Sequence, residues 1–265
     1  MKNFKDIVTI GTTFNKRIYE SEYQKIFADM RDNWSEIDFF VYHENSFEKE
    51  KFGQEINFSQ EIRDNLYLHD VFEVNPWMSD FIKSSPLKDC HTIGTPGCVP
   101  SSDSSPYWRR NAIYWFRKIA AIKHCIEHCK TQYLVWLGAD TYFRTDKGHP
   151  DGFDQPFFDY VSKFDCSVIK RPGQTLETDV VIFNFDKKGK EVALEWIDYF
   201  LSLRAFKEVR WDDAYILTKV MEQTENKKYS FGSVRHGVPI ENQVYRYVLH
   251  YKGPLLEIRD KKKGI

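Results

Sequence analysis

The sequence predicts an α/β fold in which helices flank an open mixed sheet of mainly parallel strands. Segments with the pattern of strands alternate along the chain with segments that have the pattern of helices. Two strands, 37–42 (IDFFVY) and 133–137 (YLVWL), are nearly continuous apolar runs, as expected where helices cover both faces of a sheet. Polar residues follow these strands, and open α/β sheets bind ligands outside the carboxyl ends of their strands. We therefore expect the functional site at that edge.

The individual elements follow from apolar periodicity and from the residues that interrupt it. The helix at 110–130 is the clearest, because Ile119, Ile122 and Ile126 recur at steps of three and four residues on one stripe. Pro, Gly and Ser residues fill 84–107, which predicts a long loop, either a lid or an insertion. The expected strands are 6–10, 37–42, 133–137, 166–169, 180–185 and 245–251, and the expected helices are 19–33, 110–130, 192–203 and 211–222.

Composition limits the class of protein. The chain has 265 residues, 42% of them hydrophobic, and a formal net charge of −1, which excludes a disordered or fibrous protein and disfavours a dedicated nucleic-acid binder. No window approaches the roughly 20 apolar residues of a membrane span, and the start lacks the apolar run of a signal peptide. The odd number of cysteines, 5, favours reduced thiols. We expect a single cytoplasmic domain over 1–265.

Asp140 is the first candidate for chemistry. It follows the strand 133–137 in the sequence GADT. A carboxylate at the end of a buried strand is suited to Mg²⁺ or Mn²⁺, which prefer oxygen ligands and bridge diphosphates. An aspartate after a strand also commonly forms a turn or caps a helix, so this residue alone leaves both interpretations open.

Short motifs, taken in their order along most of the chain, resemble one enzyme family. They are WFRKIAAI, LGADT, ETDVVIFNF, WDDAYIL and HYKG. This order is similar to that of the GT-A class of nucleotide-sugar-dependent glycosyltransferases. The resemblance implies a GT-A-like sheet in which residues 1–145 bind the nucleotide sugar and residues 146–265 bind the acceptor. It also implies a metal, Mn²⁺ or Mg²⁺, that bridges the phosphates of a nucleoside diphosphate sugar.

The sequence departs from this class at one position. The strand usually ends Asp-any-Asp, but Gly138 stands at the first acidic position, so only Asp140 carries over as a metal ligand. The motif HYKG is similar to the C-terminal motif that faces the diphosphate, which implies that His250 binds the metal and Lys252 binds phosphate. The open alternatives are Asp140 with His250 and phosphate oxygens, another recruited acid, or a reaction without metal. A purely structural His250 is also open.

Residues after the first two strands match by position the places where this class holds the nucleoside. They are Thr12, Phe14, Asn15 and Glu44. A nucleoside needs a ring to stack on, a group that reads the base edge and an acceptor for the ribose hydroxyls. The alternative is that these are loop residues without a ligand.

Two adjacent basic residues lie on the helix expected at 110–130. Lys118 flanks the apolar stripe, so its stem can run beside the core while its ammonium reaches a polar site. We therefore expect Lys118 to contact the donor. Arg117 points almost opposite the stripe and is expected to face solvent.

Glycosyl transfer needs a group that takes the acceptor's proton or stabilises a cationic sugar. Asp212 and Asp213 begin an expected helix, where the helix N-terminus also favours carboxylates, so capping explains one of them. The resemblance implies a catalytic or acceptor-binding acid at this place, and we assign Asp213 to it. Glu177 and Asp179 form a second candidate pair on the acceptor side.

A possible zinc site on the helix at 110–130 is discounted. His124, Cys125, His128 and Cys129 have the four-residue spacing of metal ligands. At about 100° per residue, however, the histidines point away from the apolar stripe and the cysteines lie beside it. We expect two surface histidines and two core thiols. The lysines at 261–263 are expected to be a solvated tail, with a weak phosphate contact as the alternative.

We therefore expect a glycosyltransferase that moves a sugar from a nucleoside diphosphate sugar to a hydroxyl acceptor. The acceptor class is open and includes glycans and hydroxylated DNA bases, since Trp108, Arg109 and Arg110 lie beside the long loop. Two alternatives are a binding module that recognises a sugar nucleotide or glycan without turnover, and a nucleotidyltransferase. Release of nucleoside diphosphate indicates the first function, binding without release the second, and release of pyrophosphate the third.

Overall fold

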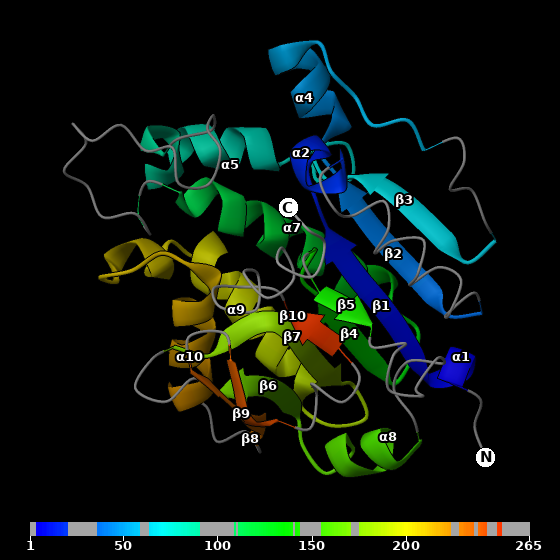
Figure 1. Cartoon of the computed structure of the whole chain (residues 1–265). Coiled ribbons are helices and arrows are strands. Elements are labelled where there is room, and N and C mark those ends of the chain that lie inside the picture. Colours follow the sequence, from blue (N-terminus) through cyan, green and yellow to red (C-terminus); the bar gives the residue numbers. More distant parts are fainter. Residues whose placement is uncertain are drawn as a thin grey trace.

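The computed structural model confirms the α/β class (Figure 1). It describes residues 4–20, 36–58, 64–90, 109, 111–139, 141–143, 155–170, 175–223, 228–235, 238–242 and 248–250. An 8-stranded sheet has the order β3-β2-β1-β4-β7-β6-β8-β9, and β10 pairs with β5 in a separate 2-stranded sheet. The strands are β1 Val8–Thr13, β2 Asp38–His43, β3 Leu66–Asp70, β4 Tyr133–Leu137, β5 Thr141–Phe143, β6 Cys166–Lys170, β7 Glu177–Asn184, β8 Lys228–Arg235, β9 Val238–Asn242 and β10 Val248–His250.

The large sheet is mainly parallel, as the sequence predicts. β1 is parallel to both β2 and β4, and β2 is parallel to β3. β7 runs antiparallel to its neighbours β4 and β6, and β9 runs antiparallel to β8. The chain passes from β1 outward through β2 to β3 and then returns to place β4 on the other side of β1. This reversal of strand order between β1 and β4 is the position at which open α/β sheets bind ligands.

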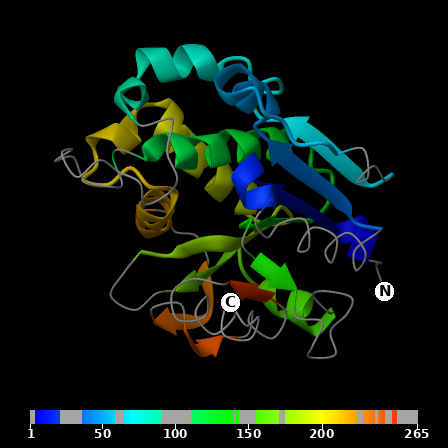
Figure 2. The same cartoon turned by 45° about the horizontal axis from the view of Figure 1, so that its top comes forward.

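Helices cover both faces of the sheet. The α-helices are α1 Phe4–Ile7, α2 Lys16–Ile18, α4 Asn45–Phe52, α5 Met78–Ser84, α7 Ala112–His128, α8 Gln155–Val161, α9 Gly189–Leu201 and α10 Asp213–Gln223, with short 3₁₀ turns at η2 Pro86–Asp89 and η4 Arg204–Lys207. The helices α7, α9 and α10 pack on one another and on β1 and β7 (Figure 2). The helix α8 contributes its aromatic side chains to the core on the opposite face.

Strand β4 shows why the apolar run YLVWL predicts burial on both faces. Leu134 and Trp136 pack in the core beneath α7 and α9, whereas Tyr133, Val135 and Leu137 pack in the core of the other face. All five side chains are buried. Successive strand residues point to opposite faces, so only a strand covered on both sides needs an unbroken apolar run.

Several expected elements are confirmed with small shifts, and others fall outside the described residues. The helix at 110–130 is α7, the helices at 192–203 and 211–222 are α9 and α10, and the final strand at 245–251 is β10 within its described part. The strand expected at 180–185 is β7, which begins earlier, at Glu177. Most of the helix expected at 19–33 and of the loop expected at 84–107 lies outside the described residues.

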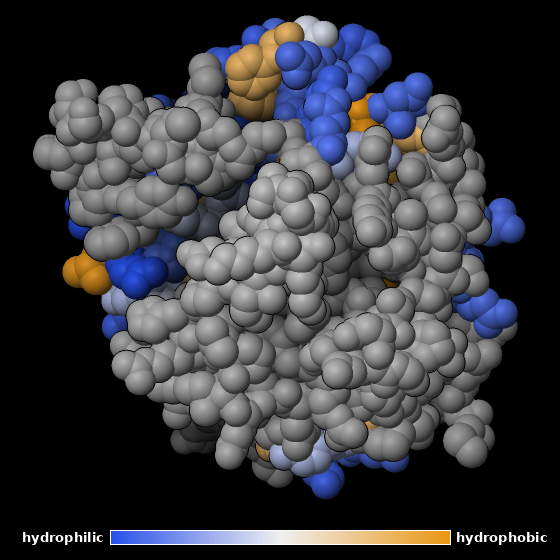
Figure 3. Space-filling model, viewed as in Figure 1, coloured by the Kyte–Doolittle hydropathy of each residue, from blue (hydrophilic) through white to orange (hydrophobic). Residues whose placement is uncertain are grey.

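The described part of the surface that Figure 3 shows is mainly polar. On the face in Figure 3, the described residues are mostly hydrophilic, with single hydrophobic side chains between them. The large exposed hydrophobic residues of the described part are Phe52, Tyr67, Leu194, Leu203 and Val209. Scattered residues of this kind are normal and define no docking surface. Within the described part of the chain, we find no helix with the length and hydrophobicity needed to cross a membrane.

Candidate functional site

The candidate site lies at the carboxyl edge of the sheet, where the strand order reverses. The strands β1, β2 and β4 end at this edge, and the antiparallel strand β7 begins there because Leu137 pairs with Val180. The amide of Gly138 donates to the carbonyl of Asp179 at 2.7 Å, and the hydroxyl of Thr141 donates to the same carbonyl at 3.3 Å. Gly138 and Thr141, which flank Ala139 and Asp140 in the sequence, are therefore both attached to the start of β7.

The adjacent basic residues of α7 reach carboxylates from two sides of this edge. Arg117 contacts Glu44, which follows β2, and Lys118 contacts Asp213, which begins α10. Adjacent helical residues point about 100° apart, so one helix can serve two sides of the site. The site therefore contains two buried ion pairs that share α7.

The pair of Arg117 and Glu44 contradicts the expectation that Arg117 faces solvent. Arg117 Nη1 donates to Glu44 Oε2 at 2.6 Å, and the side chains are 3% and 9% exposed. The guanidinium also lies 4.3 Å from the ring centre of Phe47 and 5.3 Å from that of Phe72. Phe47 belongs to α4, and Phe72 to the segment after β3. They cover the face of α7 that lies opposite its apolar stripe, where a guanidinium can pack on aromatic rings. Burial raises the pKa of Glu44, and the charge of Arg117 opposes that shift.

The carboxylate of Asp70 holds the start of α4, and with it Glu44, at the edge. It accepts hydrogen bonds from the amide of Ser46 at 2.6 Å, from the hydroxyl of Ser46 at 2.8 Å and from the amide of Phe72 at 2.9 Å. Burial alone would raise the pKa of Asp70, but hydrogen bonds from His43 and Ser46 lower it to about 2. Asp70 is therefore an ionised structural group at neutral pH.

The second ion pair brings together two of the predicted residues. Lys118 Nζ donates to Asp213 Oδ2 at 2.7 Å and to the backbone carbonyl of Thr178 at 2.8 Å. The side chains of Lys118 and Asp213 are 12% and 6% exposed. The hydroxyl of Thr178 donates to the same carboxylate oxygen at 2.8 Å. Thr178 was not among the predicted residues, although a polar residue at the start of the apolar run VVIFNF is the signal that could have singled it out.

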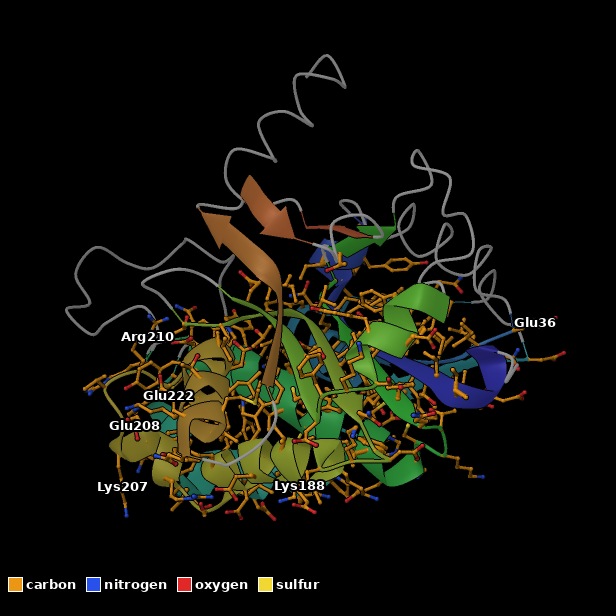
Figure 4. All side chains as sticks on the ribbon, turned by 90° about the horizontal axis from the view of Figure 1, so that it is seen from below. Glu36, Lys188, Lys207, Glu208, Arg210 and Glu222 are labelled. Carbon is orange, nitrogen blue, oxygen red and sulfur yellow. The ribbon has the colours of Figure 1, made fainter. Side chains whose placement is uncertain are left out.

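Asp212 has the capping role expected for one member of its pair. Its Oδ1 accepts from the amide of Tyr215 at 3.0 Å, and its Oδ2 accepts from Nε of Arg210 at 2.8 Å. Glu208 accepts hydrogen bonds from the hydroxyls of Tyr199 and Tyr215. Figure 4 shows Arg210 and Glu208 on the same side of the molecule, with Glu36 on the other side. These contacts stabilise the start of α10 and so the position of its next residue, Asp213.

The other acid pair lies at the start of β7. Glu177 and Asp179 are 7% and 8% exposed, and Glu177 Oε1 accepts from the amide of Thr178 at 3.2 Å. The carbonyl of Asp179 binds both Gly138 and Thr141. The structure therefore brings this pair to the same edge as Lys118.

The residues predicted for the nucleoside lie at the ends of β1 and β2, in a closely packed environment. Thr12 is fully buried, and Phe14 is 2% exposed with its ring centre 5.4 Å from that of Tyr19. Asn15 caps α2, since its Oδ1 accepts from the amide of Ile18 at 3.0 Å. Glu44 is engaged with Arg117. Their roles toward a nucleoside stay predictions.

The residues proposed for the metal, Asp140 and His250, and for the phosphate, Lys252, fall mostly outside the described residues. Asp140 and Lys252 lie in the parts of the chain that are not described, and only the backbone of His250 is described. That backbone pairs with Thr141, the residue after Asp140. Within the described ranges, no group of three or more His, Cys, Asp and Glu residues could hold a metal ion.

The histidines of α7 are corrected in part. His124 is 8% exposed, and its Nδ1 lies 2.9 Å from the hydroxyl of Tyr42, so it is not a surface residue. Its ring stacks on that of the exposed His128, with centres 4.0 Å apart. Burial lowers the pKa of His124 to about 4. Cys125 is buried as expected, whereas Cys129 is half-buried. Tyr42 of β2 and His69 of β3 pack against His124, on the face of α7 that the periodicity predicts to be exposed.

Comparisons with known proteins give similarity in shape only. No protein-family model and no curated protein matches the chain. The chain is similar to the glycosyltransferase GlyE of Streptococcus pneumoniae TIGR4, with 11% identity and a TM-score of 0.42 over 88% of this chain and 46% of that one. The apo form of GlyE gives 12% identity and a TM-score of 0.45 over 87% and 46% of the two chains. This chain thus spans less than half of the GlyE chain.

A third similar structure is a glycosyltransferase involved in the glycosylation of the major capsid of PBCV-1. Its identity is 10% and its TM-score is 0.48, over 97% of this chain and 99% of that one. Likeness at this level says nothing of what the present chain binds. The function therefore has to be argued from the site itself.

Proposed function

We propose that the chain is a glycosyltransferase that moves a sugar from a nucleoside diphosphate sugar to a hydroxyl acceptor. The observation that carries the proposal is the Lys118 ammonium, held by Asp213 and Thr178 at the edge where the strand order reverses. An ammonium has three donors, and two are used within the described part of the chain. The third is suited to an anionic oxygen of a donor diphosphate.

The reaction transfers one group and releases another. The acceptor oxygen forms a bond to the anomeric carbon, and the bond from that carbon to the diphosphate oxygen breaks. The nucleoside diphosphate leaves with the electron pair, and a fixed cation such as Lys118 stabilises the charge that develops on it. A carboxylate at the same edge takes the acceptor's proton, and Glu177 and Asp179 are the candidates.

The proposed metal is a second positive charge for the donor diphosphate, beside that of Lys118. Asp140 and His250 would hold Mn²⁺ or Mg²⁺, and the backbone of His250 pairs with that of Thr141, the residue that follows Asp140 in the sequence. When bound, the ion offsets charge on the phosphates. Lys252 would add a positive charge close to His250, since it lies two residues further along the chain. The nucleoside would lie toward the end of β1, near Thr12, Phe14 and Asn15.

Binding of the donor provides the first test. We expect at least one member of a panel of UDP- and GDP-sugars to raise the melting temperature in the presence of Mn²⁺, because a ligand that binds the folded state stabilises it. Lys118→Met should lower that shift, and Lys123→Met, on the same helix but with its partner Glu127 outside the site, is the matched control. The absence of any shift across the panel would contradict the proposal.

A further inference from the structure

Thr178 contacts both members of the ion pair that the proposed function uses. Its hydroxyl donates to Asp213 Oδ2 at 2.8 Å, and its carbonyl accepts from Lys118 Nζ at 2.8 Å. Since Lys118 also donates to Asp213 Oδ2 at 2.7 Å, the three residues form a closed ring of hydrogen bonds. Thr178 is 3% exposed, so water does not readily replace its hydroxyl.

Both carboxylate oxygens of Asp213 accept hydrogen bonds from groups of the chain itself. Oδ2 accepts from Lys118 and from Thr178, and Oδ1 accepts from the amide of Ala214 at 2.9 Å. A carboxylate that takes a proton from an acceptor hydroxyl needs an oxygen directed at that hydroxyl. Asp213 directs its oxygens at groups of its own chain. This favours a role different from the one expected from its place in the sequence.

We propose that Thr178 is a positioning residue that fixes the Lys118 ammonium through Asp213, and that Asp213 is the counter-ion of Lys118 and not the base of the reaction. The inference rests on the proposed glycosyl transfer for its kinetic consequence. Without the hydroxyl, Oδ2 loses one of its two donors, the carboxylate can rotate, and the ammonium follows it away from the diphosphate. A displacement of this kind is costly in catalysis because fixed charges act only when correctly placed.

Two substitutions of Thr178 distinguish an effect on the position of Lys118 from an effect on the stability of the fold. Thr178→Val keeps the size and branching of the side chain but removes the hydroxyl, and Thr178→Ser keeps the hydroxyl. Thr9→Val is the matched control, because Thr9 is also a buried strand residue whose hydroxyl makes one 2.8 Å contact with a side chain, that of Thr131. Thr9 lies on β1, and its partner Thr131 lies in the segment before β4, away from Lys118 and Asp213.

The first readout requires no donor. In the free protein, we expect acetic anhydride to acetylate Lys118 about threefold or more faster in Thr178→Val than in wild type, measured by mass spectrometry against the other lysines. Thr178→Ser and Thr9→Val should stay within about twofold of wild type. Equal labelling of Lys118 in all four proteins would overturn the inference, whether or not the protein is a glycosyltransferase.

The second readout uses turnover of the donor found in the thermal-shift panel. We expect Thr178→Val to lower kcat/KM about tenfold, Thr178→Ser to restore it to within about threefold, and Thr178→Val to have no further effect in a Lys118→Met background. Additive losses in that double variant would overturn the inference. If the wild type turns over no nucleotide sugar, the proposed function fails while the labelling result still decides the role of Thr178.

Discussion

Arg117 Nη1 lies 2.6 Å from Glu44 Oε2, and both side chains are almost completely buried between α7 and α4. A buried charge that loses its partner is far more costly than a buried pair that is replaced as a unit. The pair joins the end of β2 to α7, the helix that also carries Lys118. Its contribution to the free energy of unfolding can be measured without any assay of activity.

We expect Arg117→Met and Glu44→Gln each to lower the free energy of unfolding by roughly 3 kcal/mol, since each leaves one buried charged or polar group without its partner. The double variant should recover a large part of that loss. Urea denaturation of the four proteins measures both effects. Strictly additive losses would show that the two side chains do not interact in solution.

The buried imidazole of His124 predicts acid sensitivity. Its pKa is lowered to about 4 by burial, whereas an unfolded histidine has a pKa near 6.5. Between these values the unfolded chain binds a proton that the native protein does not, so stability is full above about pH 6.5 and falls as the pH falls toward 4. His124 alone would cost about 2 kcal/mol by pH 5.

The measurement is urea denaturation of wild type and His124→Gln at pH 7 and pH 5. The variant is expected to be less stable at pH 7 and to lose less stability between the two pH values. His69, whose pKa is also lowered by burial, remains in both proteins and adds its own acid sensitivity to each. An identical pH dependence of the two proteins would refute a neutral, buried His124.

Backbone packing at Gly189 predicts a severe effect of a single methyl group. A Cβ there would lie 2.3 Å from the amide nitrogen of Asn184 and 2.5 Å from the carbonyl of Asp165. These are backbone atoms, which cannot move aside as a flexible side chain can, so we expect Gly189→Ala to cost about 3 kcal/mol or more.

Gly53 provides the control for this prediction. It has φ +65°, and a methyl group on its Cα would meet no atom within 4 Å. Gly53→Ala should cost only about 1 kcal/mol, for the left-handed conformation. Thermal unfolding of both variants gives the comparison, and equal losses would contradict the close approach at Gly189.

His250 tests the proposed metal site. The register of β10 with β5 pairs His250 with Thr141, next to Asp140. We expect His250→Ala to weaken Mn²⁺-dependent binding of the nucleotide sugar at least about tenfold, or roughly 1.4 kcal/mol, and to leave metal-free binding unchanged. Calorimetric titration with and without Mn²⁺ measures this. Unchanged metal-dependent affinity would leave Asp140 without its proposed partner.

The parts of the fold that the sequence predicted are those with long apolar signals. The unbroken run at 133–137 and the stripe on 110–130 correspond to β4 and α7, because burial on both faces or on one helix face requires them. The edge strand β3, Leu66–Asp70, is only partly buried and gives a weaker signal. The antiparallel direction of β7 depends on its pairing with β4 and β6, and its apolar run gives no information about direction.

The site was predicted less completely, for a physical reason. The helix periodicity places Lys118 beside the core, and its ammonium does reach the polar edge. The same periodicity places Arg117 in solvent, but α4 and Phe72 cover that face, and such tertiary contacts cannot be read from one helix. Thr178 was missed because its role depends on where α10 places Asp213.

The central claim is that this edge of the sheet transfers a sugar from a nucleoside diphosphate. The most direct measurement is mass spectrometry of the products formed from a stabilising nucleotide sugar and Mn²⁺ by wild type and by Asp140→Asn, which keeps the shape but removes the charge. We expect wild type to release nucleoside diphosphate and the variant, still folded by circular dichroism, to release at least about a hundredfold less. Release of pyrophosphate, or equal release by the two proteins, would contradict the claim.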